Sequence, residues 1–283
     1  MLPNKSTACH KSLHAAYSES DFLSIKYDTY FPVYERLLGG FREKEIILVE
    51  VGVFQGGSLF MWREFLGKKA RIIGIDLNPG ARVWEEYGFE IHIGDQASEG
   101  FWNEFFSKIG KVDIVIDDGG HTNRQQIVTT HCAVANIKDG GLLIVEDVHT
   151  NYFREFGNPS RYSFLNFTFR VIDSVNSRSH AMRRLRRIYS DRVYSIQFYE
   201  SIVAFEIDSS LCKQSVPTSN YGESRGLKDF RYQGQIKCLL YKIKDKFGAK
   251  GRLYGKIACR STDTVLWLLS KLESFKSYRY FRD

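Results

Sequence analysis

Residues 111–124, KVDIVIDDGGHTNR, decide how this 283-residue chain is interpreted. The apolar run from Val112 to Ile116 is typical of a parallel strand that is covered on both faces. The run ends in two aspartates and two glycines, and glycines permit a sharp turn where the chain leaves a sheet. Because ligands of open α/β sheets bind at the carboxyl ends of strands, Asp117, Asp118 and His121 are candidate site residues. A solvated turn is the alternative, since Asp and Gly are ordinary turn residues.

Three earlier strands are also followed by glycine or acidic residues. The strand from Ile46 to Val51 leads into VGVFQGGS (residues 51–58) and an apolar helix, which predicts a ligand-binding turn where Gly52 lets the backbone approach a ligand. The strand from Arg71 to Ile75 ends at Asp76, where an acid commonly holds the two hydroxyls of a ribose. The strand from Glu90 to Ile93 ends at Gly94 and Asp95, which we place beside an adenine ring.

Known nucleotide motifs narrow the choice of ligand. The turn contains no GK[ST], so a P-loop is excluded. The spacing GxGxxG is not met either, and this disfavours an NAD enzyme. S-adenosylmethionine carries the same kind of ribose as NAD and stays open as the ligand.

A fifth strand brings two more acids to the same edge. Leu142 to Val145 is followed directly by Glu146 and Asp147, after a predicted helix over residues 122–138. Together with Asp117 and Asp118, these side chains make a dense group of carboxylates. Such a group either shares protons or holds a hard divalent cation.

The flanking segments complete the predicted fold. Residues 1–20 are interpreted as a polar lead-in, residues 21–38 as a helix with Pro32 in a first turn or at a kink, and residues 151–162 as a loop over the pocket. Two close strands, Val193 to Phe198 and Ile202 to Ile207, are expected to form an antiparallel pair at the sheet edge. The fold class is therefore α/β, a Rossmann-like doubly wound seven-stranded sheet with a terminal antiparallel hairpin.

Charge divides the chain into two predicted domains, residues 1–210 and 211–283. The second part carries sixteen Lys and Arg against six Asp and Glu, a net charge of +10, whereas the first part has a net charge of −3. Its apolar positions recur at helical spacing, which predicts a basic amphipathic helical extension. Three arrangements of this extension stay open: it packs on its own domain, contacts a protein partner or lies on an anionic membrane surface. We see no recognition motif for nucleic acid.

Cysteine use and hydropathy bear on location. The five cysteines are dispersed, with no CxxC pair, which suggests reduced thiols. We find no run of eighteen apolar residues and no secretory signal at the N-terminus, so no transmembrane helix is expected. The expected location is the cytoplasm, with peripheral contact at the inner membrane face and a homo-oligomer as open alternatives.

Several motifs resemble one family. VEVGVFQGGS (residues 49–58) and IGIDLNP (residues 73–79) are similar to the first two motifs of class I S-adenosylmethionine-dependent methyltransferases. VIDDGGH, LLIVEDVHTNY and SIQFYESIVAFE, with YDTYFPVYERLL before the first strand, resemble the metal-dependent sugar O-methyltransferases of macrolide biosynthesis and the cephalosporin hydroxylase-type proteins that share their module. The resemblance covers roughly residues 22–208.

The resemblance implies roles for particular residues. Residues for S-adenosylmethionine would be Glu50, Gly52, Gly56, Ser58, Asp76, Gly94, Asp95 and Asp117. Asp118, Glu146 and Asp147 would bind Mg²⁺ or another divalent cation, and His121 would be the general base, with Asp118 also at the catalytic centre. Relatives also have an Asp-Asp pair where this chain has Glu146-Asp147, so Glu146 is the ligand in doubt.

The implied function is Mg-assisted O-methylation of a sugar hydroxyl. The acceptor is expected to be a glycan such as a surface polysaccharide, which the basic extension favours, or a glycosylated natural product. Two alternatives stay open: an O-methyltransferase of a phenol or another small metabolite, and a non-catalytic cofactor-binding subunit of a glycan-assembly complex.

Overall fold

The structure, a computed structural model, describes residues 11–157, 160–179, 188–223, 225–226, 235–248 and 253–281. Its internal contacts divide the chain into two compact units, Met1–Pro217 and Thr218–Asp283. The boundary predicted from charge at residue 210 stays a prediction.

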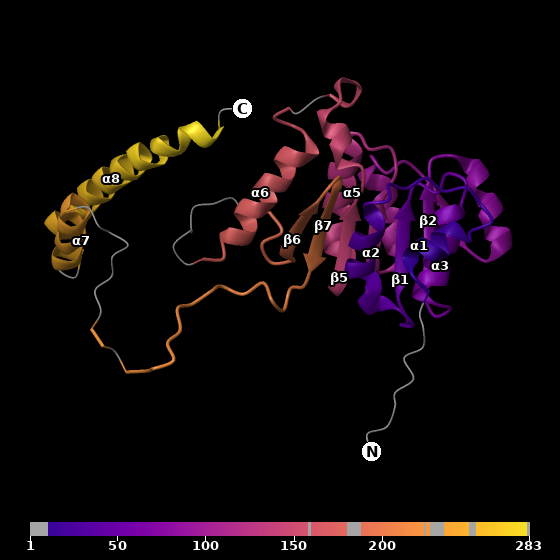
Figure 1. Cartoon of the computed structure of the whole chain (residues 1–283), viewed down its shortest axis with the longest axis horizontal. Coiled ribbons are helices and arrows are strands. Elements are labelled where there is room, and N and C mark those ends of the chain that lie inside the picture. The colour runs from indigo at the N-terminus through magenta and orange to yellow at the C-terminus, as the bar shows by residue number, and fades with distance from the viewer. Residues whose placement is uncertain are drawn as a thin grey trace, which may run out of the picture. The chain divides into compact units, whose positions relative to one another are not determined.

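Strands and helices alternate along the first unit (Figure 1). In chain order they are α1 (Leu13–Ser18), α2 (Tyr30–Leu38), β1 (Ile47–Val51), α3 (Gly57–Leu66), β2 (Arg71–Asp76), β3 (Glu90–Ile93), α4 (Glu99–Ile109), β4 (Val112–Asp117), α5 (Asn123–Asn136), β5 (Ile137–Val145), α6 (Phe164–Asn176), β6 (Val193–Tyr199) and β7 (Ile202–Ile207). Short 3₁₀ helices lie at Gly39–Phe41, Pro79–Tyr87, Val148–Tyr152 and Arg154–Phe156.

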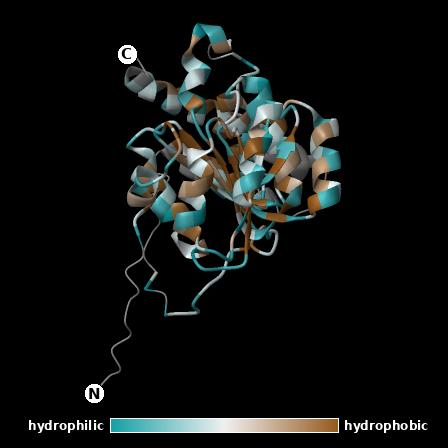
Figure 2. Cartoon of the chain, turned by 90° about the vertical axis from the view of Figure 1, so that its right-hand side faces the viewer, coloured by the Kyte–Doolittle hydropathy of each residue, from teal (hydrophilic) through white to brown (hydrophobic). Residues whose placement is uncertain are grey.

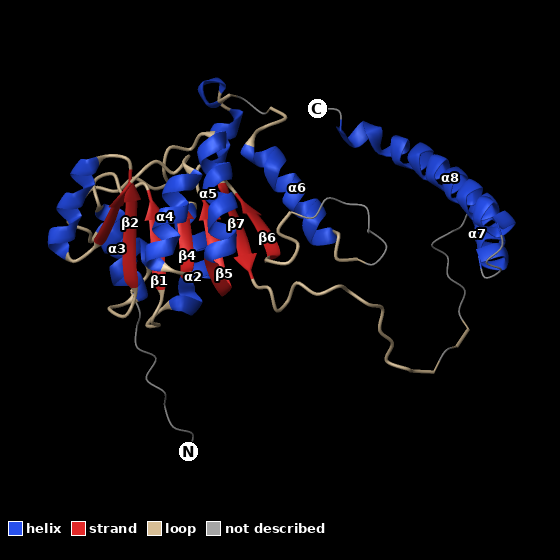
Figure 3. Cartoon of the chain, turned by 180° about the vertical axis from the view of Figure 1, so that it is seen from behind, coloured by secondary structure: helices blue, strands red, loops and turns tan. Residues whose placement is uncertain are grey.

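The seven strands form one sheet in the order β3-β2-β1-β4-β5-β7-β6 (Figure 3). The first five strands run parallel to one another. β7 pairs antiparallel with both β5 and β6, so the terminal hairpin closes one edge of the sheet. The predicted fold class, a Rossmann-like doubly wound sheet with a terminal hairpin, is therefore confirmed.

Helices cover both faces of the sheet, and Figure 2 shows the apolar strands between them. Successive side chains of a strand point to opposite faces. Leu48 accordingly packs in one apolar cluster with residues of α1, α2 and α3, including the buried Trp62. Its neighbour Val49 packs in a second cluster with residues of α4, α5 and α6, including the buried Trp102. Burial on both faces explains why the strands are continuous apolar runs.

Four sequence predictions about segments were wrong in detail. The polar lead-in contains α1, whose Leu13 and Ala16 are buried. The helix predicted from residue 21 begins only at Tyr30, and Pro32 sits in its first turn, where its missing N–H is not needed. The helix over residues 122–138 ends at Asn136, because Ile137 already pairs with Val112 in the sheet. The expected loop after β5 contains two short 3₁₀ helices, Val148–Tyr152 and Arg154–Phe156.

The second unit is helical, as predicted. It contains α7 (Gln235–Gly248), α8 (Leu253–Phe275) and the 3₁₀ helix Lys276–Phe281. Val265, Leu268 and Leu272 of α8 are exposed, whereas Leu266 and Leu269 are partly buried. None of the helices that the structure describes is long and apolar enough to cross a bilayer.

Candidate active site

The site lies where the order of the strands reverses. β1 and β4 are neighbours, and Val51 at the end of one strand pairs with Asp117 at the end of the other. The helices after these two strands cover opposite faces, so a crevice opens between their carboxyl ends. A cavity of about 650 Å³ occupies this crevice. Predicted cofactor residues in its lining are Gly52, Ser58, Asp76, Gly94 and Asp95.

Gly52 needs to be glycine for two reasons. Its φ of +90° lies in the region that residues with a side chain rarely adopt. A Cβ at this position would also lie 2.1 Å from the carbonyl oxygen of Asp118. The turn after β1 therefore touches the turn after β4, and a side chain here would separate the two.

Asp76 holds the glycine turn in place. Its Oδ2 accepts hydrogen bonds from the backbone N–H groups of Val53 (2.9 Å) and Phe54 (3.2 Å), and its Oδ1 accepts one from the N–H of Asn78 (2.8 Å). The carboxylate also lines the cavity. Its proposed contact with a ribose stays a prediction, but its second role in shaping the turn is visible.

Three residues that the family resemblance assigned to the cofactor, Glu50, Gly56 and Asp117, do not line the cavity. Glu50 is fully buried and accepts hydrogen bonds from Trp62 Nε1 (2.9 Å) and Ser58 Oγ (2.8 Å). Burial raises the pKa of Glu50 to about 7, although the positive charge of Lys26 opposes the shift. Gly56 precedes α3, and a Cβ there would lie 2.4 Å from the Trp84 ring. Glu50 and Gly56 support the turn from behind.

Asp117 is a buried carboxyl with one unpaired oxygen. Its Oδ1 accepts hydrogen bonds from Gln96 Nε2 (2.8 Å) and from the N–H of Gly119 (3.3 Å). Its Oδ2 has no hydrogen-bond partner among the described residues. Burial raises the pKa of Asp117, and the Gln96 hydrogen bond opposes this. Gln96 also accepts a hydrogen bond from the N–H of Gly120 (2.8 Å), so it joins the end of β3 to the turn after β4.

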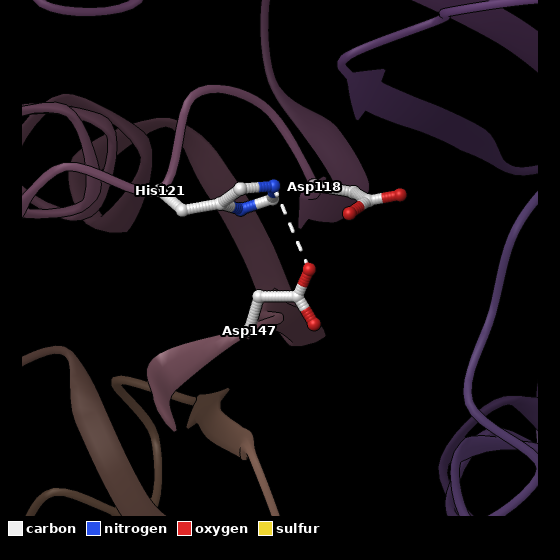
Figure 4. A group of neighbouring side chains, drawn as sticks. All are labelled: Asp118, His121 and Asp147. Carbon is white, nitrogen blue, oxygen red and sulfur yellow. Dashed lines mark ion pairs between the residues drawn. The ribbon is translucent and has the colours of Figure 1, made fainter. Parts of the chain in front are cut away.

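Asp118, His121 and Asp147 come together beside the cavity (Figure 4). One ligand atom from each lies within 4.8 Å of the others, and His121 Nε2 is 3.5 Å from Asp147 Oδ2. His121 and Asp147 have φ values of +57° and +53°. Thr150 Oγ1 donates to the carbonyl oxygens of both residues, at 3.1 and 2.8 Å, and holds the two unusual backbone conformations together. Such strained residues persist when the surrounding structure determines them, and they often mark functional sites.

These three residues fit a divalent cation. Carboxylate oxygens suit Mg²⁺ and Mn²⁺, and an imidazole suits several transition metals. His121 Nδ1 is buried without a hydrogen-bond partner among the described residues, so that side of the ring has not been satisfied within the protein. The donor set therefore fits a metal ion held by Asp118 and Asp147 beside a histidine.

The structure does not bring Glu146 into this group. Its side chain is 1% exposed and points to the interior. There it accepts a hydrogen bond from Tyr34 and forms an ion pair with Lys26 Nζ at 2.8 Å. Lys26 Nζ also lies 2.6 Å from Asp118 Oδ2. The doubt about Glu146 as a metal ligand thus has a physical basis: a lysine already neutralises it.

The ionisation of this buried group follows from its charges. Burial by itself lowers the pKa of Lys26, but the charges of Asp118, Glu146 and Glu50 outweigh it and raise the pKa. Burial raises the pKa of Glu146 to about 8; the charge of Asp118 adds to this shift and that of Lys26 opposes it. Burial also raises the pKa of Asp118. Lys26 therefore stays protonated, and burial disfavours a second negative charge among the carboxyl groups around it.

Sequence analysis missed Lys26 and two tyrosines. Tyr30 OH lies 2.5 Å from Asp147 Oδ1, and Tyr34 binds Glu146. All three residues lie within the helix predicted over residues 21–38, and the sequence pattern gives them no role at the site. A lone lysine among the apolar and aromatic residues before α2 was the one available signal.

Comparison with known proteins identifies the class. Residues 49–148 match the family model described as a methyltransferase domain. This match and the seven-stranded fold show that the chain contains a methyltransferase domain.

Its relatives narrow the resemblance. The chain is similar to demethylmacrocin O-methyltransferase of Streptomyces fradiae, with 33% identity over 136 residues that make up 46% of this chain and 34% of that protein. It is also similar to the 8-demethyl-8-alpha-L-rhamnosyl tetracenomycin-C 2'-O-methyltransferase of Streptomyces olivaceus, with 28% identity over 63% of this chain and 50% of that one. The resemblance to macrolide sugar O-methyltransferases expected from the sequence is therefore confirmed.

Solved structures agree on the fold. The MycE methyltransferase of the mycinamycin biosynthetic pathway, in complex with Mg, SAH and mycinamycin VI, matches with a TM-score of 0.61 and 24% identity over 73% of this chain and 56% of that chain. The chain spans about a third to a half of the length of the curated relatives named above.

Proposed function

We propose that this chain transfers a methyl group from S-adenosylmethionine to a hydroxyl of a sugar ring, with a divalent cation such as Mg²⁺ held by Asp118 and Asp147. The observation that carries the proposal is the group of Asp118, His121 and Asp147 beside the cavity at the β1/β4 crevice. The names of the relatives, which are O-methyltransferases of sugar-bearing natural products, support it.

The cavity offers the contacts that this cofactor needs. The methyl donor supplies an electrophilic carbon, and the cation makes a bound hydroxyl more acidic. Gly52 lines the cavity, and Asp76 presents a carboxylate for ribose hydroxyls. Gly94 and Asp95 line the part of the cavity next to β3, where we place the adenine.

His121 is the proposed general base. Its Nε2 accepts the proton of the acceptor hydroxyl as the oxygen attacks the methyl carbon, and the bond from that carbon to the sulfur of S-adenosylmethionine breaks, so that S-adenosylhomocysteine leaves. Asp147, 3.5 Å away, stabilises the imidazolium that forms. The strained backbone at both residues fixes the direction of the ring before the acceptor arrives.

We propose that the acceptor binds on a set of aromatic rings near Asp147. We define the aromatic rim as Tyr27, His149 and Phe153. The Tyr27 and His149 rings are 5.5 Å apart and perpendicular, and the His149 and Phe153 rings are 5.3 Å apart. Tyr27 is 55% and Phe153 44% exposed, so both have free surface. The C–H groups of a sugar ring pack favourably on the negative face of an aromatic ring.

Among sugar acceptors, we propose a surface polysaccharide built at the inner face of a membrane. The net charge of +10 over residues 211–283 and the exposed apolar side chains of α8 support this choice. Both features suit an anionic surface. A glycosylated natural product, the kind of acceptor named for the relatives, is the second candidate.

The test begins with calorimetric titration of the full chain by S-adenosylmethionine, with Mg²⁺ and then with EDTA. Methyl transfer is next measured with methyl glycosides and with catechol as the phenolic comparison. Binding followed by Mg-dependent transfer to a glycoside supports the proposal. No binding of S-adenosylmethionine under any condition overturns it, and transfer to catechol alone replaces the sugar acceptor with a phenol.

A further inference from the structure

Tyr30 is a buried phenol at the site, and the proposed mechanism gives it no role. It is the first residue of α2 and is 2% exposed. Its hydroxyl donates a hydrogen bond to Asp147 Oδ1 over 2.5 Å. A hydrogen bond to a charged acceptor is roughly twice as strong as one between neutral groups. Tyr30 is therefore well suited to fix the carboxylate that it contacts.

The main chain around Asp147 is held without any help from Tyr30. The carbonyl oxygen of Asp147 accepts a hydrogen bond from Thr150 Oγ1 (2.8 Å). The next residue, Val148, donates its N–H to the carbonyl oxygen of Ser201, in the turn between β6 and β7 (3.0 Å). These contacts fix the backbone of Asp147 but do not reach its carboxylate. The direction of the carboxylate depends on what its own oxygens touch.

The two oxygens of Asp147 face different partners. Oδ1 is bound by the hydroxyl of Tyr30, whereas Oδ2 lies 3.5 Å from His121 Nε2 (Figure 4). Asp118 completes the candidate metal group, in which one atom of each of the three residues lies within 4.8 Å of the others. A carboxylate held in this way presents one oxygen, and not both, to a cation in the group.

We infer that Tyr30 is a positioning residue that makes Asp147 a one-oxygen ligand and thereby favours Mg²⁺ or Mn²⁺ over Ca²⁺. Mg²⁺ needs a near-octahedral arrangement at short distances, whereas Ca²⁺ accepts both oxygens of a carboxylate in a flexible shell. Mn²⁺ takes the same octahedral oxygen sites as Mg²⁺. The inference rests on the proposed function only in assuming that a divalent cation binds at Asp118 and Asp147.

The substitution Tyr30→Phe tests this inference, because it removes the hydroxyl and keeps the ring. Mn²⁺ binding to the full chain is measured by electron paramagnetic resonance, and Ca²⁺ binding by its displacement of Mn²⁺, so no acceptor is needed. We expect Tyr30→Phe to weaken Mn²⁺ binding by about tenfold or more, the usual cost of losing the partner that orients a metal ligand. Ca²⁺ binding should change less than about threefold, because a freed carboxylate can offer it both oxygens. A purely structural role would weaken the binding of both cations alike.

Tyr189→Phe is the matched control. The hydroxyl of Tyr189 also makes a hydrogen bond of 2.5 Å, but its partner is His131 Nδ1, away from the site. This variant should leave the binding of both cations unchanged. Circular dichroism and urea unfolding check that both variants keep the fold.

The outcomes separate the inference from the proposed function. The inference is overturned if Tyr30→Phe keeps the Mn²⁺ affinity of the wild type, or if Ca²⁺ binding falls as much as Mn²⁺ binding. It is also overturned if the wild type binds no Mn²⁺, since no cation then depends on Asp147. Calorimetric titration of the wild type with S-adenosylmethionine tests the proposed function independently of these results.

Discussion

His121 combines a candidate base with a left-handed backbone. Its φ of +57° limits the substitutions that test its chemistry, because most residues would add strain. Asparagine tolerates this conformation and cannot act as a general base at neutral pH. The substitution His121→Asn therefore separates the role of the ring from that of the turn.

We expect His121→Asn to lower kcat by roughly 10²- to 10⁴-fold, the usual contribution of a general base. The Kd for S-adenosylhomocysteine should stay within about twofold, because the turn is kept. Calorimetry and a methyl-transfer assay measure the two quantities. His131→Asn is the control, since His131 contacts Tyr189 away from the site. An unchanged kcat in His121→Asn would exclude His121 as the base.

The burial of Glu50 leads to a second prediction, on how stability depends on pH. Its pKa is raised by burial from 4.5 to about 7. Between these values the folded state holds a proton that the unfolded state has lost, so the free energy of unfolding falls as pH rises from 4.5 to 7. The loss amounts to about 3 kcal/mol when the full shift is realised.

Glu50→Gln should abolish that loss. The stability of the variant relative to the wild type should rise with pH across this window, as measured by urea unfolding. Glu104→Gln, at an exposed position of α4, should show no such rise. A pH-independent difference for Glu50→Gln would mean that Glu50 ionises normally.

At the scale of elements, the contact between the turns after β1 and β4 shapes the cavity. Gly52→Ala would place a Cβ 2.1 Å from the Asp118 carbonyl oxygen and impose a φ of +90° on alanine. We expect a loss of stability of about 1–3 kcal/mol from backbone strain alone, and more from the clash. S-adenosylhomocysteine binding should weaken by at least about tenfold.

Gly110→Ala is the matched control for this prediction. Gly110 also has a positive φ, +79°, but a Cβ there would meet nothing within 4 Å. It should lose stability by strain and keep its affinity for the cofactor. Equal affinities in the two variants would show that the turn contact does not shape the cofactor site.

The aromatic rim belongs to the two segments that flank the site. Phe153 follows the 3₁₀ helix Val148–Tyr152, and Tyr27 precedes α2. We expect Phe153→Ala to raise the KM for the glycoside acceptor by about fivefold to tenfold, with the cofactor Kd unchanged. Phe169→Ala removes another exposed ring, from α6, and serves as the control. An unchanged acceptor KM would remove Phe153 from the acceptor site.

At the scale of the whole molecule, we expect cofactor binding to need only the first unit and membrane binding to need the second. All residues that line the cavity belong to the unit that ends at Pro217. A chain ending there should bind S-adenosylhomocysteine like the full chain. The full chain should also cosediment with phosphatidylglycerol vesicles, less so in high salt, because residues 211–283 carry a net charge of +10.

Two comparisons check this prediction. Vesicles of phosphatidylcholine alone should bind the full chain more weakly, since they lack negative charge. The shortened chain should not sediment with either vesicle. If the shortened chain sediments with the vesicles, or if the full chain does not, the basic extension is not what binds the membrane.

The sequence by itself determined the order of the elements and the edge where the site lies. Apolar runs ending in glycines and acids are local patterns, and a parallel strand buried on both faces has few alternatives. The strand ends at Gly52, Asp76, Asp118 and Asp147 were therefore predictable, and so was the terminal hairpin. The role of each side chain was inferred from the family resemblance.

Only the tertiary structure decided which acidic side chains face the cavity and which lie in the interior. Glu50 and Glu146 stand beside site residues in the sequence, but their side chains point into the interior, where Trp62, Tyr34 and Lys26 meet them. Lys26 lies 92 residues from Asp118 and 120 from Glu146 along the chain, so no local pattern couples them. The pairing arises because the segment before α2 crosses the ends of β4 and β5, and a buried charge must find its partner there.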